Sequence, residues 1–344
     1  MRHLELHSMS SLVIGHRGAA GYRPEHTLAS YELAVRLGVD VIEPDLVATK
    51  DGVLVARHEP EISGTTDVAR HPGFAGRRTT RAVDGVPVTG WFSDDFTLAE
   101  LRTLRAVERI PALRPHNALY DGRERVPTFQ EILDLAARAS RRYGRRIGVA
   151  PEAKHPTYFR ERGRPLEPAL VRALDRNRLN RPGAGVYVQC FEVSTLVALR
   201  SSLRVALVQL TSATGAPYDL VAAGDPRTYE DLTTPAGLRQ VARYADVLGP
   251  DKTQIVPRDA AGASRPATTL VRDAHRAGLA VVPYTFRNEN AFLPLELRSG
   301  TDPAAYGDAS GEYADFFRLG VDGLFTDNGD TAVEARDTRR LAAV

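Results

Sequence analysis

The stretch VIGHRGAAGYRPEHT, residues 13–27, runs from a short apolar segment directly into a histidine, an arginine and a glycine. A tight turn after a strand is usually built from Asn-Gly or Asp-Gly, whose backbones readily adopt the required angles. Histidine and arginine are not needed for that purpose. We therefore interpret His16 and Arg17 as functional residues at the open end of a strand.

The same order of apolar strand, turn and amphipathic helix recurs along the chain. The apolar segments are rich in Val, Ile and Leu without alternation, which is typical of parallel strands buried on both faces. A helix is expected at 24–38, with Pro24 in its first turn and Gly38 at its end. Eight such strands with intervening helices predict an α/β fold, a (β/α)8 TIM barrel. The strands are expected at residues 11–15, 39–46, 146–152, 185–191, 203–210, 245–251, 279–286 and 321–327.

Residues 60–126 interrupt this order. They follow a short extra strand at 52–59, are rich in Gly, Pro, Arg and Thr, and are too many for a simple loop. We expect an inserted subdomain near the barrel mouth, within one barrel that spans 11–335. Residues 1–10 lack the apolar region of a signal peptide. We interpret them as an N-terminal extension, or as a scar left where a signal was removed.

Composition excludes several classes of protein. The 344 residues include 45 Lys and Arg and 43 Asp and Glu, a net charge of +2 that gives no field for binding nucleic acid. No apolar run approaches the roughly 18 residues that a transmembrane helix needs. The single cysteine, Cys190, excludes an internal disulfide and a cysteine-based zinc site, and its apolar neighbours predict a place in the core.

Carboxylates gather where the second and third expected strands end. Glu43 and Asp45 are two residues apart, so their side chains share one face of a strand, and Glu152 comes from the next strand. Such acids repel one another unless a cation or a shared proton relieves them. Oxygen ligands favour Ca²⁺ or Mg²⁺ over zinc. The alternative is that Glu43 and Asp45 pair with arginines of the barrel.

Two histidines, His16 and His58, follow strands at this same end. A cation and Arg17 would neutralise charge on the oxygens of a phosphodiester. One histidine would take a proton from the nucleophile while the other protonates the leaving alkoxide. This combination predicts a metal-dependent phosphodiesterase. Of the remaining histidines, His26 is expected to order its loop and His155 to lie within reach of substrate.

The segment HRGAAGYRPEHTLASYELAVRLGVDVIEPDLVATKDGVLVARHE, residues 16–59, resembles the glycerophosphodiester phosphodiesterase family with its HRG, P-E-[NH]-T, E-x-D, T-x-D-G and HD signatures. The likeness continues through GVAPEAKHPTYF, VYVQCF, YADVLGPD, VVPYTFR and DGLFTDNGDTAV. These motifs resemble the bacterial calcium-dependent, periplasmic branch in particular. The resemblance implies a TIM-barrel enzyme that releases an alcohol and sn-glycerol 3-phosphate from glycerophosphodiesters such as glycerophosphocholine or glycerophosphoethanolamine.

The same resemblance implies a role for each matching residue. His16 and His58 become the acid–base pair, Arg17 and Lys154 the phosphate contacts, and Ca²⁺, or Mg²⁺ in its place, the cofactor. The family's HD pair is His58-Glu59 here, one methylene longer, which leaves open whether residue 59 orients the histidine. The metal ligands would be Glu43, Asp45 and Glu152, and the walls of the glycerol and alcohol pockets Phe191, Tyr284 and Phe286, for which the barrel core is the alternative place.

Two other functions stay open at this point. One is a lysophospholipase D or a sphingomyelinase-D-like enzyme, in which the substrate's own hydroxyl attacks to give a cyclic phosphate. The other is a protein that binds phosphodiesters or teichoic-acid-like polymers without turnover. In each case the partner is a small molecule or polymer with a phosphodiester. The family resemblance implies a secreted or periplasmic location, with the cytoplasm as the alternative, and the oligomeric state stays open.

Overall fold

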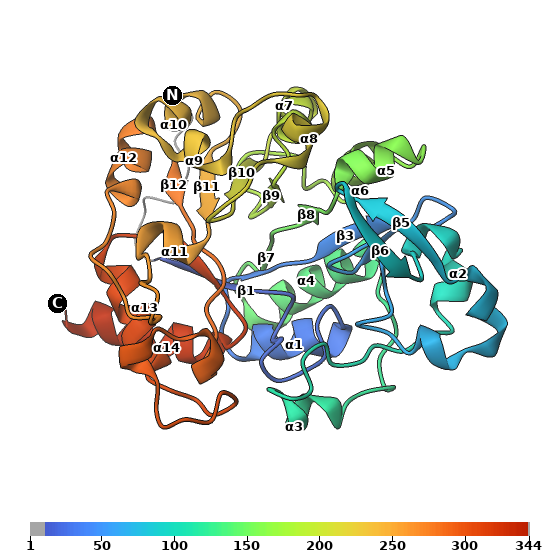
Figure 1. Ribbon diagram of the computed structural model, residues 1–344, viewed down its shortest axis with the longest axis horizontal. Helices are drawn as coiled ribbons and strands as arrows, with labels where there is room; N and C mark the ends of the chain where they lie inside the picture. The colour runs from blue at the N-terminus through green and yellow to red at the C-terminus, as the bar shows by residue number, and fades with distance from the viewer. Residues whose placement is uncertain (1–10, 343–344) are drawn as a thin grey trace.

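The computed structural model describes residues 11–342, so the expected extension at 1–10 lies outside the described residues. Helices surround a ring of short strands (Figure 1). The ring strands are β1 (Leu12–Gly15), β2 (Val41–Ile42), β3 (Asp45–Ala48), β7 (Gly148–Val149), β8 (Glu152–Ala153), β9 (Tyr187–Cys190), β10 (Ala206–Thr211), β11 (Val247–Pro250), β12 (Ala280–Val281) and β13 (Gly323–Thr326).

Parallel pairing runs through two sheets. Their orders are β13-β1-β2-β7 and β12-β11-β10-β9-β8-β3, and the short β4 (Leu54–Ala56) pairs antiparallel with the edge of β3. The ring closes where Phe286 pairs in parallel with Thr326 and the Phe325 amide donates to the Pro283 carbonyl at 3.0 Å. The expected TIM barrel is confirmed.

Two expected strands are each broken in the middle. The strand expected at 39–46 forms as β2 and β3 around Pro44, and the one at 146–152 forms as β7 and β8 around Pro151. Proline has no N–H to donate to a neighbouring strand, so regular pairing stops there. The breaks shift the chain between the two sheets beside Glu43 and Glu152. The sequence periodicity predicted the position of each strand and missed its interruption.

Helices alternate with these strands and cover the ring. The first, α1 (Leu28–Arg36), begins after Thr27, whose hydroxyl accepts from the Ser30 amide at 3.1 Å. Pro24 therefore precedes the helix instead of lying in its first turn. The others are α4 (Phe129–Tyr143), α5 (Pro156–Glu161), α6 (Glu167–Arg176), α7 (Val193–Ser202), α8 (Tyr218–Ala222), α9 (Tyr229–Thr233), α10 (Pro235–Val241), α11 (Lys252–Ile255), α12 (Leu270–Ala277), α13 (Ala309–Arg318) and α14 (Gly329–Ala342). None of the helices in the described part of the chain is long and apolar enough to cross a membrane.

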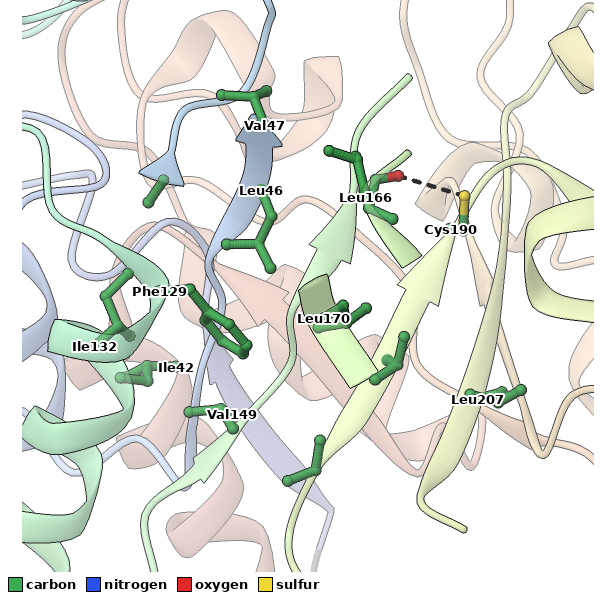
Figure 2. Packing of buried hydrophobic residues seen from close by; sticks show 14 of the residues in the cluster. Ile42, Leu46, Val47, Phe129, Ile132, Val149, Leu166, Leu170, Cys190 and Leu207 are labelled. Atoms are coloured by element: carbon green, nitrogen blue, oxygen red, sulfur yellow. Dashed lines mark hydrogen bonds between the residues drawn. The ribbon is translucent and has the colours of Figure 1, made fainter. Parts of the chain in front are cut away.

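The core between strands and helices is closely packed. Phe129 of α4, 1% exposed, points toward the strands that carry Ile42 and Val149 (Figure 2). Cys190 is fully buried in the same cluster, and its thiol donates to the Ala153 carbonyl at 3.4 Å (Figure 2). The expected place of Cys190 in the core is confirmed.

Between β4 and α4 the chain leaves the barrel. Residues 60–126 contain a separate two-stranded antiparallel sheet of β5 (Thr79–Val83) and β6 (Val86–Gly90), with α2 (Leu98–Leu101) and α3 (Pro115–Ala118). The turn Asp84-Gly85 has positive φ at both residues, 49° and 78°, as tight hairpin turns require. Asp84 accepts from Nδ1 of His155 at 2.7 Å, which brings the hairpin over the end of β8. We call residues 60–126 the insertion.

Replacing Phe129 with alanine should lower the free energy of unfolding by about 3–5 kcal/mol, because it removes a fully packed aromatic ring and leaves a cavity. Urea denaturation followed by circular dichroism measures the change. Leu119→Ala is the control, since Leu119 is 65% exposed. A Phe129→Ala loss as small as that of Leu119→Ala would contradict the packing described here.

Candidate active site

The charged side chains singled out in the sequence meet in one cavity. His16 and Arg17 directly follow β1, Glu43 lies between β2 and β3, and Asp45 opens β3. In the sheet Asp45 pairs with Glu152, and Glu152 pairs with Gln189, so these positions lie level with one another. The cavity has a volume of about 330 Å³, and its lining includes His16, Arg17, Glu43, Asp45, His58, Glu152 and Lys154.

Three of these residues form a buried carboxylate cluster. Glu43, Asp45 and Glu152 are at most 5% exposed, and each offers an oxygen within 4.8 Å of the other two. Burial and the neighbouring negative charges raise the pKa of Glu43 well above its usual range. Burial also raises the pKa of Glu152 to about 7, although Lys154 opposes the change.

Asp45 is held differently. Burial opposes its ionisation, but His26 and Lys154 lower its pKa well below the usual range. His26, fully buried, makes a 3.0 Å hydrogen bond to Oδ2 through Nε2 and contacts the Tyr31 hydroxyl through Nδ1 at 2.7 Å. The other oxygen, Oδ1, is buried and has no hydrogen-bond partner among the described residues.

These carboxylates fit a hard divalent cation. The donor atoms are all oxygens and they converge. Oδ1 of Asp45, which has no hydrogen-bond partner among the described residues, has a lone pair available for a cation. Ca²⁺ and Mg²⁺ prefer such ligands. Arginine pairing does not neutralise the cluster fully, since Arg17 lies on its rim, 3.5 Å from Asp45 through Nε. The described residues therefore include a buried acidic triad able to bind a metal.

His16 is fixed by an aspartate from the far end of the chain. Its Nδ1 is 2.5 Å from Oδ1 of Asp327, which follows β13, and its Nε2 faces Glu43 at 3.9 Å. Burial lowers the pKa of His16 to about 4 despite that aspartate, so the ring is neutral near pH 7. With Nδ1 engaged, Nε2 is the nitrogen that is free for chemistry in the cavity.

His58 has the same arrangement with a different carboxylate. Its Nδ1 hydrogen-bonds to Oε1 of Glu59, and its Nε2 is 3.1 Å from Nζ of Lys154. Burial, together with Arg17 and Lys154, lowers the pKa of His58 well below its usual value. Glu59 thus contacts the histidine despite being one methylene longer than aspartate.

Backbone strain concentrates in these turns. Arg17, His26 and His155 have positive φ angles of 57°, 53° and 47°, which residues other than glycine rarely adopt. Such residues cluster at functional sites, where the surrounding contacts hold them in place. His155 points away from the carboxylates, toward Asp84 of the insertion.

The three aromatic residues separate into two groups. Phe191 and Tyr284 line the cavity, with their ring centroids 5.9 Å apart. Phe286 is fully buried, stacks on Tyr313 and meets Phe316 edge-on. Phe286 lies beyond the end of β12, and its side chain turns outward to α13. Its expected place on the pocket wall is therefore corrected to the alternative, the core.

Other lining residues went unnoticed in the sequence. Arg258, Arg287 and Phe292 also line the cavity. A second cavity, of about 580 Å³, adjoins the first and shares His58, Lys154 and Phe191 with it. Its remaining lining includes Asp84, His155, Glu192, Tyr218 and Tyr229.

Comparisons with known proteins give one consistent result. Residues 16–331 match the model of the glycerophosphoryl diester phosphodiesterase family. Glycerophosphodiester phosphodiesterase GDPD6 of Arabidopsis thaliana is 35% identical over 328 residues, 91% of this chain and 82% of the relative. The glycerophosphodiester phosphodiesterase of Haemophilus influenzae is 28% identical over 348 residues, 94% of this chain and 89% of the relative.

Solved structures show the same fold. A crystal structure described as a glycerophosphoryl diester phosphodiesterase of Silicibacter pomeroyi has a TM-score of 0.66 at 22% identity and covers 97% of this chain and 95% of its own. A phosphodiesterase of Oleispira antarctica, in complex with the product sn-glycerol-3-phosphate, has a TM-score of 0.63 at 20% identity and covers 96% and 99%.

Glu43→Gln should weaken cation binding at least about tenfold, because it removes one charged ligand from a cluster of three. Isothermal titration of metal-stripped protein with CaCl₂ measures the effect. Glu32→Gln, on an exposed face of α1, is the matched control and should bind as the wild type does. Equal affinity in the two variants would show that the cation binds elsewhere.

Proposed function

The chain belongs to the glycerophosphoryl diester phosphodiesterase family and is an enzyme of that type, and we propose that it hydrolyses glycerophosphocholine, glycerophosphoethanolamine and similar diesters to an alcohol and sn-glycerol 3-phosphate. One observation carries the proposal. Two histidines, His16 buried and His58 partly exposed, are each held at Nδ1 by a carboxylate and line the cavity that contains the cluster of three acids. A protein that only bound phosphodiesters would not need two such groups.

The cofactor in this proposal is Ca²⁺, with Mg²⁺ as the second candidate, held by Glu43, Asp45 and Glu152. When bound there, a divalent cation supplies positive charge to the phosphate oxygens as the transition state forms. Flexible coordination by carboxylates from separate strands suits Ca²⁺ better than the strict octahedron that Mg²⁺ requires.

Arg17 and Lys154 contact the phosphate in this proposal. Arg17 is anchored by Oε2 of Glu25 at 3.0 Å, and Lys154 by Oε1 of Glu152 at 2.8 Å. Both cations line the cavity beside the carboxylate cluster. Charges that are already fixed in place stabilise a developing negative charge without reorganising during the reaction.

The two histidines exchange protons with the reacting oxygens. We assign His58 to the leaving alcohol, because it lines both cavities and contacts the Lys154 ammonium, whereas His16 lines only the first cavity. His16 then removes a proton from the attacking water as the new P–O bond forms. His58 delivers a proton from Nε2 to the alkoxide as the old P–O bond breaks, and the Lys154 ammonium, 3.1 Å from that nitrogen, supplies this proton. Each transfer contributes roughly 10²–10⁴-fold to the rate.

The second cavity suits the departing head group. Phe191, Tyr218, Tyr229 and Tyr284 present aromatic rings there, and Asp84, Glu192 and Asp251 present acids. Aromatic faces and carboxylates together attract an alkylammonium group. A water-soluble diester with an amino alcohol is thus favoured over a lyso-lipid.

Two further proposals concern organisation. The barrel spans residues 11–335 with the insertion at 60–126, whose separate β5–β6 sheet supports this division. A secreted or periplasmic location rests on the resemblance of the motifs to that branch of the family.

His58→Ala should keep cation affinity but lower turnover of glycerophosphocholine by about 10²–10⁴-fold, because one proton transfer is lost. A coupled assay for sn-glycerol 3-phosphate measures the rate. His275→Ala is the control, since His275 lies on α12 and pairs with Asp322 away from the cavity. If His58→Ala turned over as fast as this control, the role of His58 would be wrong.

Phosphorus NMR distinguishes the substrate classes. With Ca²⁺ present, glycerophosphocholine should give sn-glycerol 3-phosphate faster than lysophosphatidylcholine gives any product. Preference for the lyso-lipid, or accumulation of a cyclic phosphate, would support the lysophospholipase D or sphingomyelinase-D-like alternative. Absence of turnover with every cation and diester would support a binding protein instead.

A further inference from the structure

One loop of the insertion reaches the back of the active site. Residues 106–124 form this loop, which is closed at its base where the Ala106 amide donates to the Glu124 carbonyl at 2.9 Å and the Gly122 amide donates to the Ala106 carbonyl at 3.0 Å. Two of its arginines, Arg109 and Arg114, point into the barrel domain. Neither lines the cavity, so neither is placed to touch substrate.

Arg109 holds two carboxylates at once. Its Nη1 and Nη2 donate to the two oxygens of Glu59 at 2.9 and 2.7 Å. Its Nε and Nη2 donate to the two oxygens of Glu25, both at 2.7 Å. Glu59 in turn contacts Nδ1 of His58, and Glu25 anchors Arg17. One guanidinium therefore holds the carboxylate partner of His58 and also the carboxylate partner of Arg17, the arginine proposed to contact the phosphate.

Arg114 makes the corresponding contacts to the carboxylate partner of His16. Its Nη2 donates to Oδ2 of Asp327 at 2.7 Å, and Nε donates to Oε1 of Glu289 at 2.6 Å. Its Nη1 donates to the Ala20 carbonyl in the turn after β1 at 2.8 Å. The other oxygen of Asp327 contacts Nδ1 of His16. The side chain of Arg114 is only 6% exposed.

We propose that the insertion supplies two positioning residues for catalysis, Arg109 and Arg114, each of which fixes the carboxylate that orients one of the two histidines. This inference rests on the proposed roles of His16 and His58 in diester hydrolysis. The two relays run from Arg109 through Glu59 to His58, and from Arg114 through Asp327 to His16.

The chemistry of the residues explains why arginine is used. A carboxylate that contacts a ring nitrogen through one oxygen can still rotate, and the ring then tilts with it. Guanidinium donors in a planar fork restrain that rotation, whereas an ammonium acts as a point charge. Glu59 has one more rotatable bond than aspartate would have, and Arg109 grips both of its oxygens.

Both relays start in one loop, and this has a consequence for how the site is assembled. Arg109 and Arg114 are five residues apart, yet they serve histidines that follow different strands, His16 after β1 and His58 after β4. Displacing residues 106–124 would disturb both histidines together. The insertion is then part of the active site's support and more than a cover over its mouth.

The test compares Arg109→Lys and Arg114→Lys with Arg102→Lys. Arg102 belongs to the same insertion but pairs with Glu131 of α4, outside the site, so its variant should match the wild type.

Arg109→Lys keeps the charge and loses the fork that holds both oxygens of Glu59. Arg114→Lys keeps the charge but cannot donate to Asp327, Glu289 and Ala20 in the same fixed geometry. We expect kcat for glycerophosphocholine to fall about 10–100-fold, as is typical when an orienting partner is lost. Ca²⁺ affinity should change less than about threefold in both variants. KM should rise only in Arg109→Lys, which also loosens Glu25, the anchor of Arg17.

Leaving-group dependence distinguishes positioning from a merely structural role. In the nitrophenyl ester of glycerol phosphate the leaving phenolate needs little protonation, so a misaligned His58 costs less. Arg109→Lys should then recover to within about threefold of the wild type, while Arg114→Lys keeps its loss. Equal losses on both substrates would overturn the relay from Arg109 to His58.

Burial of Arg114 makes its variant the one more prone to misfolding. If Arg114→Lys does not fold, Asp327→Asn in the otherwise native chain tests the same relay and should lower kcat similarly. Wild-type kcat in Asp327→Asn would overturn that half of the proposal. An active wild type with unaffected relay variants contradicts only this inference, whereas a wild type inactive on every diester contradicts the proposed function.

Discussion

Burial of three carboxylates in one small volume is the constraint on which this site depends. Like charges about 4 Å apart repel by about 4 kcal/mol at the effective dielectric typical of proteins. Burial and this repulsion raise the pKa values of Glu43 and Glu152. Asp45 is kept ionised by His26 and Lys154. A cluster arranged in this way is costly without a cation and becomes favourable with one.

The barrel provides the convergence that this cluster requires. The carboxyl ends of all the parallel strands meet at one rim of the barrel. Residues that follow different strands, far apart in the sequence, therefore lie close together there. Interruption at Pro44 and at Pro151 moves the chain from one sheet to the other next to Glu43 and Glu152. Around the cluster, each cation is held by a carboxylate and each histidine by another, so the site is prepared before substrate arrives.

The sequence predicted the barrel and seven of the polar residues that line the cavity, because both depend on local patterns. Apolar periodicity marks strands, and polar residues directly after them must lie at the rim. The predicted role of His26 in ordering its loop and the predicted place of Cys190 in the core both agree with the structure. The break at each proline and the start of α1 after Thr27 have local causes that apolar periodicity alone does not encode. The outward turn of Phe286 depends on tertiary packing against α13.

Long-range partners were beyond the sequence for the same reason. Asp327 lies 311 residues from His16, and Glu59 is held by Arg109, 50 residues away in an irregular insertion. The quoted motif that contains Asp327 gave its position at a strand end, but nothing in its spacing indicated which histidine it would contact. The insertion has few regular elements, and nothing in its sequence indicated which of its arginines would contact the barrel.

Crystallography of the protein with Ca²⁺ and sn-glycerol 3-phosphate tests the central claim most directly, using anomalous scattering to locate the ion. The account predicts an ion about 2.3–2.6 Å from oxygens of Glu43, Asp45 and Glu152. The phosphate should lie on that ion, with Nε2 of His16 and of His58 within about 3.2 Å of its oxygens. An ion bound outside the carboxylate cluster, or a phosphate out of reach of either ring, would contradict the account.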